Sequence, residues 1–275
     1  MNRRDFLSFA GCSCCCFFLD SCSTAPITGR SQFTILPESF INKQSLAAYK
    51  EVKKKSKLIT EPEKLDPIVR VGTRIEKAIA YYFQSKQIKD PTQNYEWEFI
   101  LIDEPKILNA WCMPGGKIAV YSGILEITKD DNGLAAVLGH EISHAVAKHS
   151  LERASQAMTL GIGSMAADIA TGGAISRVNN TVGQVTGMDI LQLGILNPFS
   201  RVQESEADHL GIIFSSLSGY DPNGAIEVWQ RMQEKMKGKE IPQYMSTHPS
   251  SETRIHDLRA WLPYVKLQYP KISDL

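Results

Sequence analysis

Residues 130–149 read DDNGLAAVLGHEISHAVAKH, and this stretch decides the fold of the chain. Asp130 or Asp131 can cap a helix that runs to about the end of the stretch. Its middle is rich in leucine, alanine and valine, which indicates that the helix is buried. His140 and His144 lie four residues apart, so their imidazoles point to the same side of the helix. The sequence therefore predicts a buried helix that presents two histidines in one direction.

The two histidines belong to a His-Glu-x-x-His pattern at residues 140–144. Two imidazole nitrogens at this spacing can hold one zinc ion. Glu141 stands beside the metal but is poorly placed to bind it. We expect it to be the general base that takes a proton from the attacking water and passes it to the leaving amine. The alternative is a surface helix that carries these residues by chance. Buried polar groups need partners, which favours the metal site.

A hydrolytic zinc site needs three protein ligands and one open position. Residues 200–211, SRVQESEADHLG, offer the third ligand on another predicted helix. Glu204 and Asp208 share a face of that helix. Glu204 can therefore bind the metal while Asp208 accepts the outer N–H of a zinc-bound histidine. Glu206 points about 200° away from Glu204 around the helix and is the alternative ligand. We expect one zinc ion per chain.

Together, the His-Glu-x-x-His and Glu-x-x-x-Asp patterns resemble those of zinc metallopeptidase family forty-eight, which includes HtpX-type, OMA-type and CAAX endopeptidases. Further segments are similar to segments of that family: residues 109–116 (NAWCMPGG), Ser200-Arg201, and Thr247-His248-Pro249 with Arg254. The resemblance covers about residues 65–260. It fits best the soluble, periplasmic lipoprotein branch of the family.

The resemblance implies a gluzincin-type fold, an α+β and mainly helical domain with a small β-sheet whose edge strand borders the zinc cleft. An extended substrate would pair with that edge. The expected substrate-binding residues are those of the strand after the Pro-Gly-Gly turn: Gly116, Lys117, Ile118, Ala119 and Val120. His248 is expected to be catalytic, through contact with the metal or the oxyanion. The alternative is a histidine in a turn beside Pro249.

The first 22 residues are predicted to be an export signal. A pair of arginines at residues 3–4 resembles the start of a twin-arginine motif, and the apolar stretch after it is shorter than the about 20 residues of a spanning helix. Residues 19–22 (LDSC) resemble a lipobox with Cys22 as the acylated residue, and Cys12 is an alternative site. This predicts a lipid anchor on the periplasmic side of a bacterial outer membrane. Five of the six cysteines precede residue 23, which excludes a disulfide framework for the domain.

The rest of the chain is predicted to be one helical domain with a small sheet. We expect a signal peptide at residues 1–21, a lipidated cysteine and tether at 22–38, and the metallopeptidase domain at 39–275 with its core at about 65–260. Periodicity predicts further helices at 39–58, 64–86, 222–237 and 250–261, and strands at 95–102 and 117–124. Residues 151–170 are apolar, but Gln156, Asp168 and several glycines and serines argue against a membrane span. Residues 171–199 are expected to form a loop or short helical pieces.

The composition disfavours a nucleic-acid-binding protein, because 30 basic and 30 acidic side chains leave no basic field. The motifs predict a zinc-dependent endopeptidase. The predicted export signal and lipid anchor add misfolded or misassembled cell-envelope proteins as substrates and the outer-membrane assembly machinery as a partner. The alternative is a periplasmic chaperone or assembly factor that binds extended chains with little or no cleavage. A structural zinc site is disfavoured, since such sites usually fill all four positions with cysteine and histidine.

Overall fold

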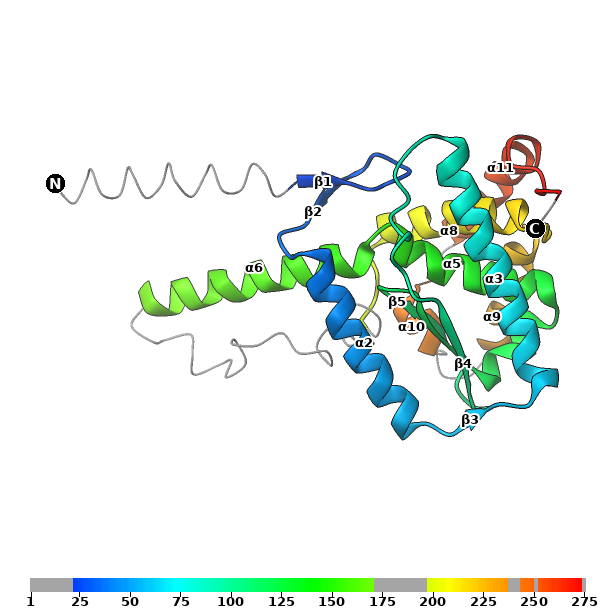
Figure 1. Ribbon diagram of the computed structural model, residues 1–275, viewed down its shortest axis with the longest axis horizontal. Helices are drawn as coiled ribbons and strands as arrows, with labels where there is room; N and C mark the ends of the chain where they lie inside the picture. Colours follow the sequence, from blue (N-terminus) through cyan, green and yellow to red (C-terminus); the bar gives the residue numbers. More distant parts are fainter. Residues whose placement is uncertain (1–21, 171–196, 237–242, 250–251, 274–275) are drawn as a thin grey trace.

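The computed structural model of the chain describes residues 22–170, 197–236, 243–249 and 252–273 (Figure 1). Its strands are β1 (Cys22–Thr24), β2 (Ser31–Phe33), β3 (Leu58–Ile59), β4 (Glu98–Ile102), β5 (Ala110–Met113) and β6 (Lys117–Tyr121). Its helices are α2 (Glu38–Lys55), α3 (Pro62–Ser85), η1 (Ser122–Ile124), α4 (Leu125–Thr128), α5 (Asp131–Val146), α6 (His149–Ala170), α8 (Arg201–Leu217), α9 (Gly224–Met236), α10 (Gln243–Thr247) and α11 (Glu252–Gln268). The predicted α+β, mainly helical fold with a small sheet is confirmed. The predicted signal peptide and the segment 171–196 lie outside the described residues.

The larger sheet has four strands in the order β3-β4-β6-β5. β6 pairs in parallel with β4 and antiparallel with β5, so hydrogen-bonded neighbours occupy both of its sides. The prediction that the strand at Lys117 is the edge strand is therefore wrong. The backbone groups expected to receive substrate, those of Gly116, Lys117, Ile118, Ala119 and Val120, lie inside the sheet. The edge strand on this side of the sheet is β5, because the turn at residues 114–116 folds the chain back so that β5 pairs with β6. Strand propensity identifies a strand but not its place in the sheet.

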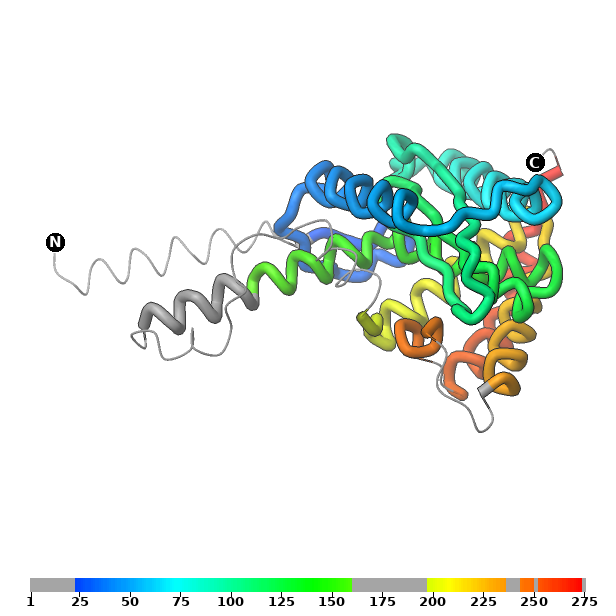
Figure 2. Tube along the Cα trace, turned by 90° about the horizontal axis from the view of Figure 1, so that it is seen from below, coloured from blue at the N-terminus to red at the C-terminus, as the bar shows by residue number. Residues whose placement is uncertain are grey.

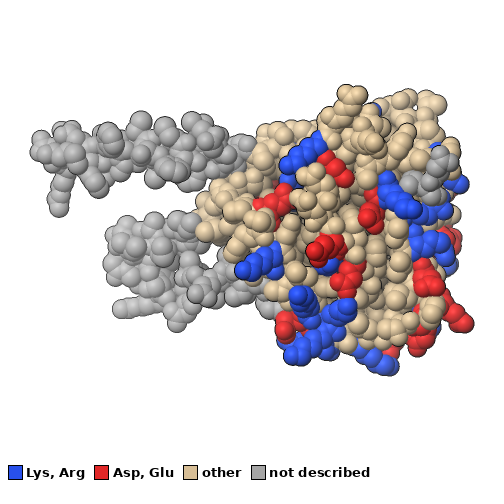
Figure 3. Space-filling view, viewed as in Figure 1, with Lys and Arg blue, Asp and Glu red and all other residues tan. Residues whose placement is uncertain are grey.

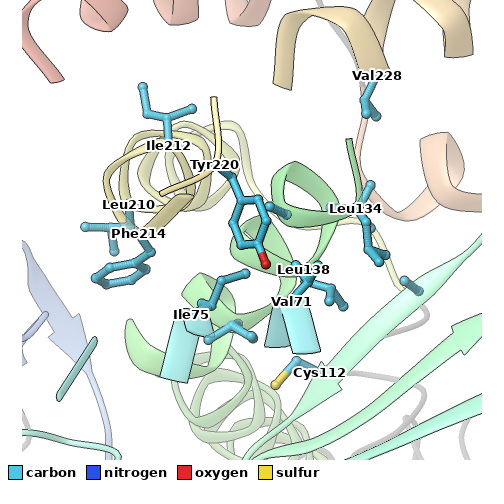
Figure 4. Close-up of a cluster of buried hydrophobic side chains, with 14 of the residues drawn as sticks. Val71, Ile75, Cys112, Leu134, Leu138, Leu210, Ile212, Phe214, Tyr220 and Val228 are labelled. Atoms are coloured by element: carbon cyan, nitrogen blue, oxygen red, sulfur yellow. The ribbon is translucent and has the colours of Figure 1, made fainter. Parts of the chain in front are cut away.

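Helices cover both faces of this sheet. Side chains alternate between the two faces along each strand. On one face Ile100, Ile102, Trp111, Met113 and Ala119 pack with Ala48 and Tyr49 of α2. On the other face Leu101, Ala110, Cys112, Ile118 and Val120 join the main core with α3, α5 and α8. Figure 4 shows part of that core, where Val71 and Ile75 of α3 lie near Cys112 of β5 and Leu138 of α5.

The predicted helix at residues 130–149 corresponds to α5, which ends at Val146 before a turn. The Asp130 side chain caps α5 by accepting a hydrogen bond from the Gly133 amide at 2.9 Å. The chain turns at Lys148, which has a φ of 57°, and α6 begins at His149. α6 then extends away from the body of the molecule (Figures 1 and 2). Among the described helices, none has both the length and the apolar character needed to cross a bilayer.

Residues 22–36 pack on the domain, so they differ from the free tether expected there. β1 and β2 form an antiparallel hairpin. Gln32 is 1% exposed, and its amide donates to the carbonyl of Ala147 at the end of α5. The hydroxyl of Ser155 in α6 accepts hydrogen bonds from the backbone amides of Ile35 and Leu36. The hairpin is thereby fixed to the corner between α5 and α6.

Basic and acidic side chains alternate on the face of the molecule shown in Figure 3. Ion pairs at the surface of the molecule include Lys53–Glu98 at 2.6 Å and Lys57–Asp103 at 2.5 Å. Surface pairs of this kind contribute little to stability individually. The balance of basic and acidic side chains in the whole chain is therefore also found on this face.

Candidate active site

The site lies where α5 and α8 cross, and two glycines allow the close approach. A Cβ atom on Gly139 of α5 would stand 2.9 Å from the carbonyl oxygen of Gly211 in α8. A Cβ atom on Gly211 would stand 3.0 Å from the amide nitrogen of His140. The helix backbones can meet here only without side chains at these two positions. This crossing brings the histidines of α5 next to the carboxylates of α8.

Four side chains that can bind a metal converge at the crossing: His140, His144, Glu204 and His248. The Nε2 atoms of His140 and His144 are 3.0 Å apart. The Nδ1 atom of His248 lies 3.2 Å from His140 Nε2 and 2.9 Å from Glu204 Oε1, and Glu204 Oε1 lies 3.4 Å from His144 Nε2. Zinc bonds of 2.0–2.1 Å in a tetrahedron would separate the ligand atoms by about 3.3 Å. The donor set and its spacing therefore fit one zinc ion.

Asp208 and Arg254 lie behind two of these residues. Asp208 Oδ1 is 3.0 Å from His140 Nδ1, the ring nitrogen that points away from the cluster. The Nε and Nη2 atoms of Arg254 donate to both oxygens of Asp208 at 2.6 and 2.7 Å, and its Nη1 atom pairs with Glu204. Burial alone would raise the pKa of Asp208, but Arg254 and His140 outweigh burial and lower it. One guanidinium thus contacts two carboxylates of α8, those of Asp208 and Glu204.

Glu141 lies beside the cluster and is 3% exposed. Burial raises the pKa of its carboxyl, although His248 and His140 oppose that effect. Among the described residues, its Oε1 atom has no hydrogen-bond partner, and His248 Nε2 lies 3.4 Å from it. A buried carboxylate oxygen that is not hydrogen-bonded within the protein can accept a proton from a substrate water.

His248 lies in the cluster and not in an exposed turn. It follows α10, is 2% exposed, and its ring packs between those of Phe199 and Tyr244, with centroids 5.3 and 4.7 Å away. Burial opposes protonation, but the carboxylates of Glu141 and Glu204 outweigh it and raise the pKa of His248. The structure therefore brings together all six residues expected at the centre of the site: His140, Glu141, His144, Glu204, Asp208 and His248.

His149 is a residue of the site that no sequence motif indicated, and Glu206, which was the alternative ligand, contacts it. His149 is fully buried, and its Nδ1 atom lies 2.8 Å from Nδ1 of His144. Its other nitrogen lies 3.0 Å from Glu206, which faces this histidine and not the metal cluster. Glu206 is therefore not a metal ligand in this arrangement. The sequence signal for this contact was a further carboxylate on α8, that of Glu206, together with a histidine directly after α5.

The free edge of the sheet borders this site through β5. Tyr121 donates its amide to the Asn109 carbonyl, and antiparallel pairing alternates, so the N–H and C=O groups of Ala110 and Cys112 point away from β6. Both residues are buried, at 1% and 4% exposure. α10 lies at the beginning of this edge, where the Tyr244 amide donates to the carbonyl of Leu108. Burial raises the pKa of the Cys112 thiol, which fits a buried apolar role.

The crossing helices and their ligand set define a helical zinc metallopeptidase domain, and comparisons with known proteins agree. The model of "Peptidase family M48" matches residues 70–262. The chain is 34% identical to the mitochondrial metalloendopeptidase OMA1 of Schizosaccharomyces pombe over 88% of this chain and 67% of that protein. It is 31% identical to OMA1 of Saccharomyces cerevisiae over 95% and 75%, and 26% identical to the beta-barrel assembly-enhancing protease of Escherichia coli over 88% and 48%. The chain belongs to peptidase family M48. It is a zinc metalloendopeptidase, as the motifs predicted.

The predicted location is wrong. A lipid anchor on the periplasmic side of a bacterial outer membrane was expected from residues 1–22. The fungal relatives at 34% and 31% identity, and further matches in plants and animals, are mitochondrial metalloendopeptidases. A leader with two arginines and an apolar stretch does not by itself distinguish one membrane system from another. Cys22 begins β1.

Proposed function

We propose that His140, His144 and Glu204 are the zinc ligands and that Glu141 is the general base. The observation that carries this assignment is the spacing of 2.9–3.6 Å among the converging nitrogen and oxygen atoms, beside a buried Glu141 oxygen without a hydrogen-bond partner among the described residues. Asp208 Oδ1 lies 3.0 Å from Nδ1 of His140, where it would fix this ring by accepting its outer N–H. Bound zinc would activate water and polarise the scissile carbonyl.

In the proposed reaction the residues of this chain position groups and move one proton. Glu141 takes a proton from the attacking water and delivers it to the amine that leaves when the peptide bond breaks. Its raised pKa makes the protonated form accessible during this transfer. The ring of His248 stands across from Glu141 and fills the fourth position of the cluster in this structure. We propose that His248 moves away, or donates to the oxyanion, when substrate binds.

We propose misfolded or misassembled membrane-associated proteins, such as those of a cell envelope, as substrates. This is supported by the name of the Escherichia coli relative, which refers to β-barrel assembly. An extended chain would pair with the outward backbone groups of Ala110 and Cys112 on β5, by strand addition. The Ala110 N–H now donates to Oδ1 of Asn109 at 3.0 Å and would have to exchange that partner. Partners in an assembly machinery belong to the same proposal. Because α10 now lies at the beginning of this edge, strand addition requires that α10 shifts.

A second candidate is a chaperone or assembly factor that holds extended chains with little cleavage. Two observations favour it: His248 occupies the fourth position and the β5 edge is buried, so the described state cannot receive a scissile bond. The two functions make different demands on Glu141. A chaperone does not need the general base, whereas a peptidase does.

The test uses the full chain and its Glu141→Gln variant, each loaded with one zinc ion, and a chemically unfolded protein as substrate. We expect the wild type to cleave about 10²- to 10⁴-fold faster than the variant, because this is the usual contribution of a general base. Equal cleavage by both proteins would contradict the role of Glu141. If neither the wild type nor His248→Ala cleaves while both retain zinc and bind the unfolded chain, the chaperone function is favoured.

A further inference from the structure

A chain of buried polar contacts leads from His144 to the N-terminal hairpin. His144 Nδ1 lies 2.8 Å from His149 Nδ1, and His149 Nε2 lies 3.0 Å from Glu206 Oε2. The same Glu206 oxygen accepts a hydrogen bond from Nε of Arg30 at 2.7 Å. The two histidines and Glu206 are each at most 7% exposed. Four side chains from α5, α6, α8 and the hairpin thus form one continuous path.

The hydrogen positions along this path are determined by its two ends. Glu206 accepts hydrogen bonds from the Thr28 hydroxyl and from Arg30 Nε, and the Arg30 guanidinium pairs with it as a carboxylate. The carboxylate can only accept, so His149 carries its hydrogen on Nε2 and accepts on Nδ1. His144 must then donate from Nδ1. This leaves the lone pair of its Nε2 atom pointing into the metal cluster.

Arg30 is the only group on this path that comes from outside the metallopeptidase helices. Its Nη1 and Nη2 atoms donate to the two oxygens of Glu152 at 2.9 and 2.8 Å, while Nε holds Glu206. The side chains of Glu152 and Glu206 are 7% and 4% exposed, and that of Arg30 is 23% exposed. Two buried carboxylates share this guanidinium. Without it, their repulsion would move Glu206 away from His149.

We propose that His149 and Glu206 are positioning residues for the zinc ligand His144, and that Arg30 holds them in place from the N-terminal hairpin. The hairpin at residues 22–33 is then a part of the zinc site and not a linker to it. This inference rests on the proposed role of His144 as a ligand. The hairpin directly follows the predicted leader. According to this proposal it affects metal affinity through the side chains of Arg30, Glu206 and His149.

The test measures zinc affinity of the full chain by competition with a chromogenic chelator, and the visible absorption of the cobalt-loaded protein. We expect His149→Leu, Glu206→Leu and Arg30→Ala each to weaken zinc binding by about 10- to 100-fold, the usual effect of losing a partner behind a ligand. Glu206→Gln keeps an acceptor for His149 and should lose less than Glu206→Leu. An altered cobalt spectrum would show that the ligand geometry itself has changed.

The matched control is Arg70→Ala, which removes a bidentate ion pair with Asp131 at the opposite end of α5 and should leave zinc affinity unchanged. In the His149→Leu background, Arg30→Ala should cost nothing further, because its effect passes through His149. An unchanged zinc affinity in Arg30→Ala and His149→Leu overturns the proposal. If Glu206→Leu fails to fold, the zinc affinity of Arg30→Ala tests the proposal instead. The Arg30 side chain is partly exposed, so its loss leaves the helices intact.

His144→Ala separates this inference from the assignment on which it rests. If His144→Ala loses zinc while the His149 and Arg30 variants keep it, only the positioning role is wrong. If His144→Ala retains zinc with full affinity, the ligand assignment fails and the positioning role fails with it.

Discussion

Arg254 is the residue on which the charge balance of the site depends. It binds both oxygens of Asp208, pairs with Glu204, and lies with its guanidinium carbon 4.2 Å from the centre of the Trp229 ring. Its removal would leave two buried carboxylates close together. We expect Arg254→Met to lower the free energy of unfolding of the zinc-free protein by about 3–5 kcal/mol, as for other broken buried pairs. Urea unfolding at pH 7 measures this.

Arg70→Met is the matched control for Arg254→Met. Arg70 pairs with Asp131, and the two side chains are 52% and 44% exposed. We expect a loss below about 1 kcal/mol, because exposed ion pairs contribute little. Equal losses in the two variants would show that burial does not determine the contribution of Arg254.

His248 is expected to restrain hydrolysis in the described state. Its Nδ1 atom occupies the position that a substrate group or water needs. If the form with His248 in place is populated ten to one, His248→Ala should raise kcat/KM on an unfolded substrate about tenfold. Zinc content should stay at one ion per chain. A fall in kcat with unchanged KM would instead assign His248 to the oxyanion and contradict the restraining role.

The crossing of α5 and α8 is the feature at the scale of elements that creates the site. Alanine has a helix propensity better than glycine by about 1 kcal/mol, so propensity alone predicts that Gly211→Ala stabilises the protein. Packing predicts the reverse, since the added Cβ would stand 3.0 Å from the His140 nitrogen and 3.1 Å from the Gly139 carbonyl carbon. We expect a net destabilisation of about 1–3 kcal/mol and weaker zinc binding. The sign of the change in urea unfolding decides between the two.

The contact between the hairpin and the helices should make stability depend on pH. The pKa of Glu206 falls from 4.5 to about 2, so its ionised form stabilises the fold above pH 4.5, and this contribution is lost as the pH falls toward 2. Between pH 6 and pH 3 the difference in unfolding free energy between wild type and Glu206→Gln should shrink by about 2 kcal/mol. Denaturant titrations of the zinc-free proteins at both pH values measure it. A difference that does not change with pH would show that Glu206 is not held as an anion by its partners.

Zinc should stabilise the whole molecule, because its ligands come from two helices and, with His248, from the segment after α10. Free zinc at about a thousand times its dissociation constant would add about 4 kcal/mol, or roughly 10 °C in Tm for a chain of this size. Removal of zinc by a chelator should lower Tm by that amount, and added zinc should restore it. Glu141→Gln should show the same shift and His144→Ala none. A shift that survives in His144→Ala would place the metal elsewhere.

The sequence by itself determined the family, the mainly helical class and the chemistry of the centre. His140, Glu141 and His144 are neighbours along one helix, and Glu204 and Asp208 lie one turn apart on another, so local periodicity suffices to place each set on one face. The predicted leader did not determine the location, because the relatives that overturn that prediction are recognised through the peptidase domain.

Only the tertiary structure decided which strand forms the edge of the sheet next to β6 and what lies behind His144. The order of strands depends on how the turn at residues 114–116 folds β5 back, and strand propensity carries no information about that pairing. The contacts of His149 and Glu206 join residues 57 positions apart, and Arg30 lies 176 positions from Glu206. Such contacts arise from packing between elements. A periodic pattern within one element carries no information about that packing.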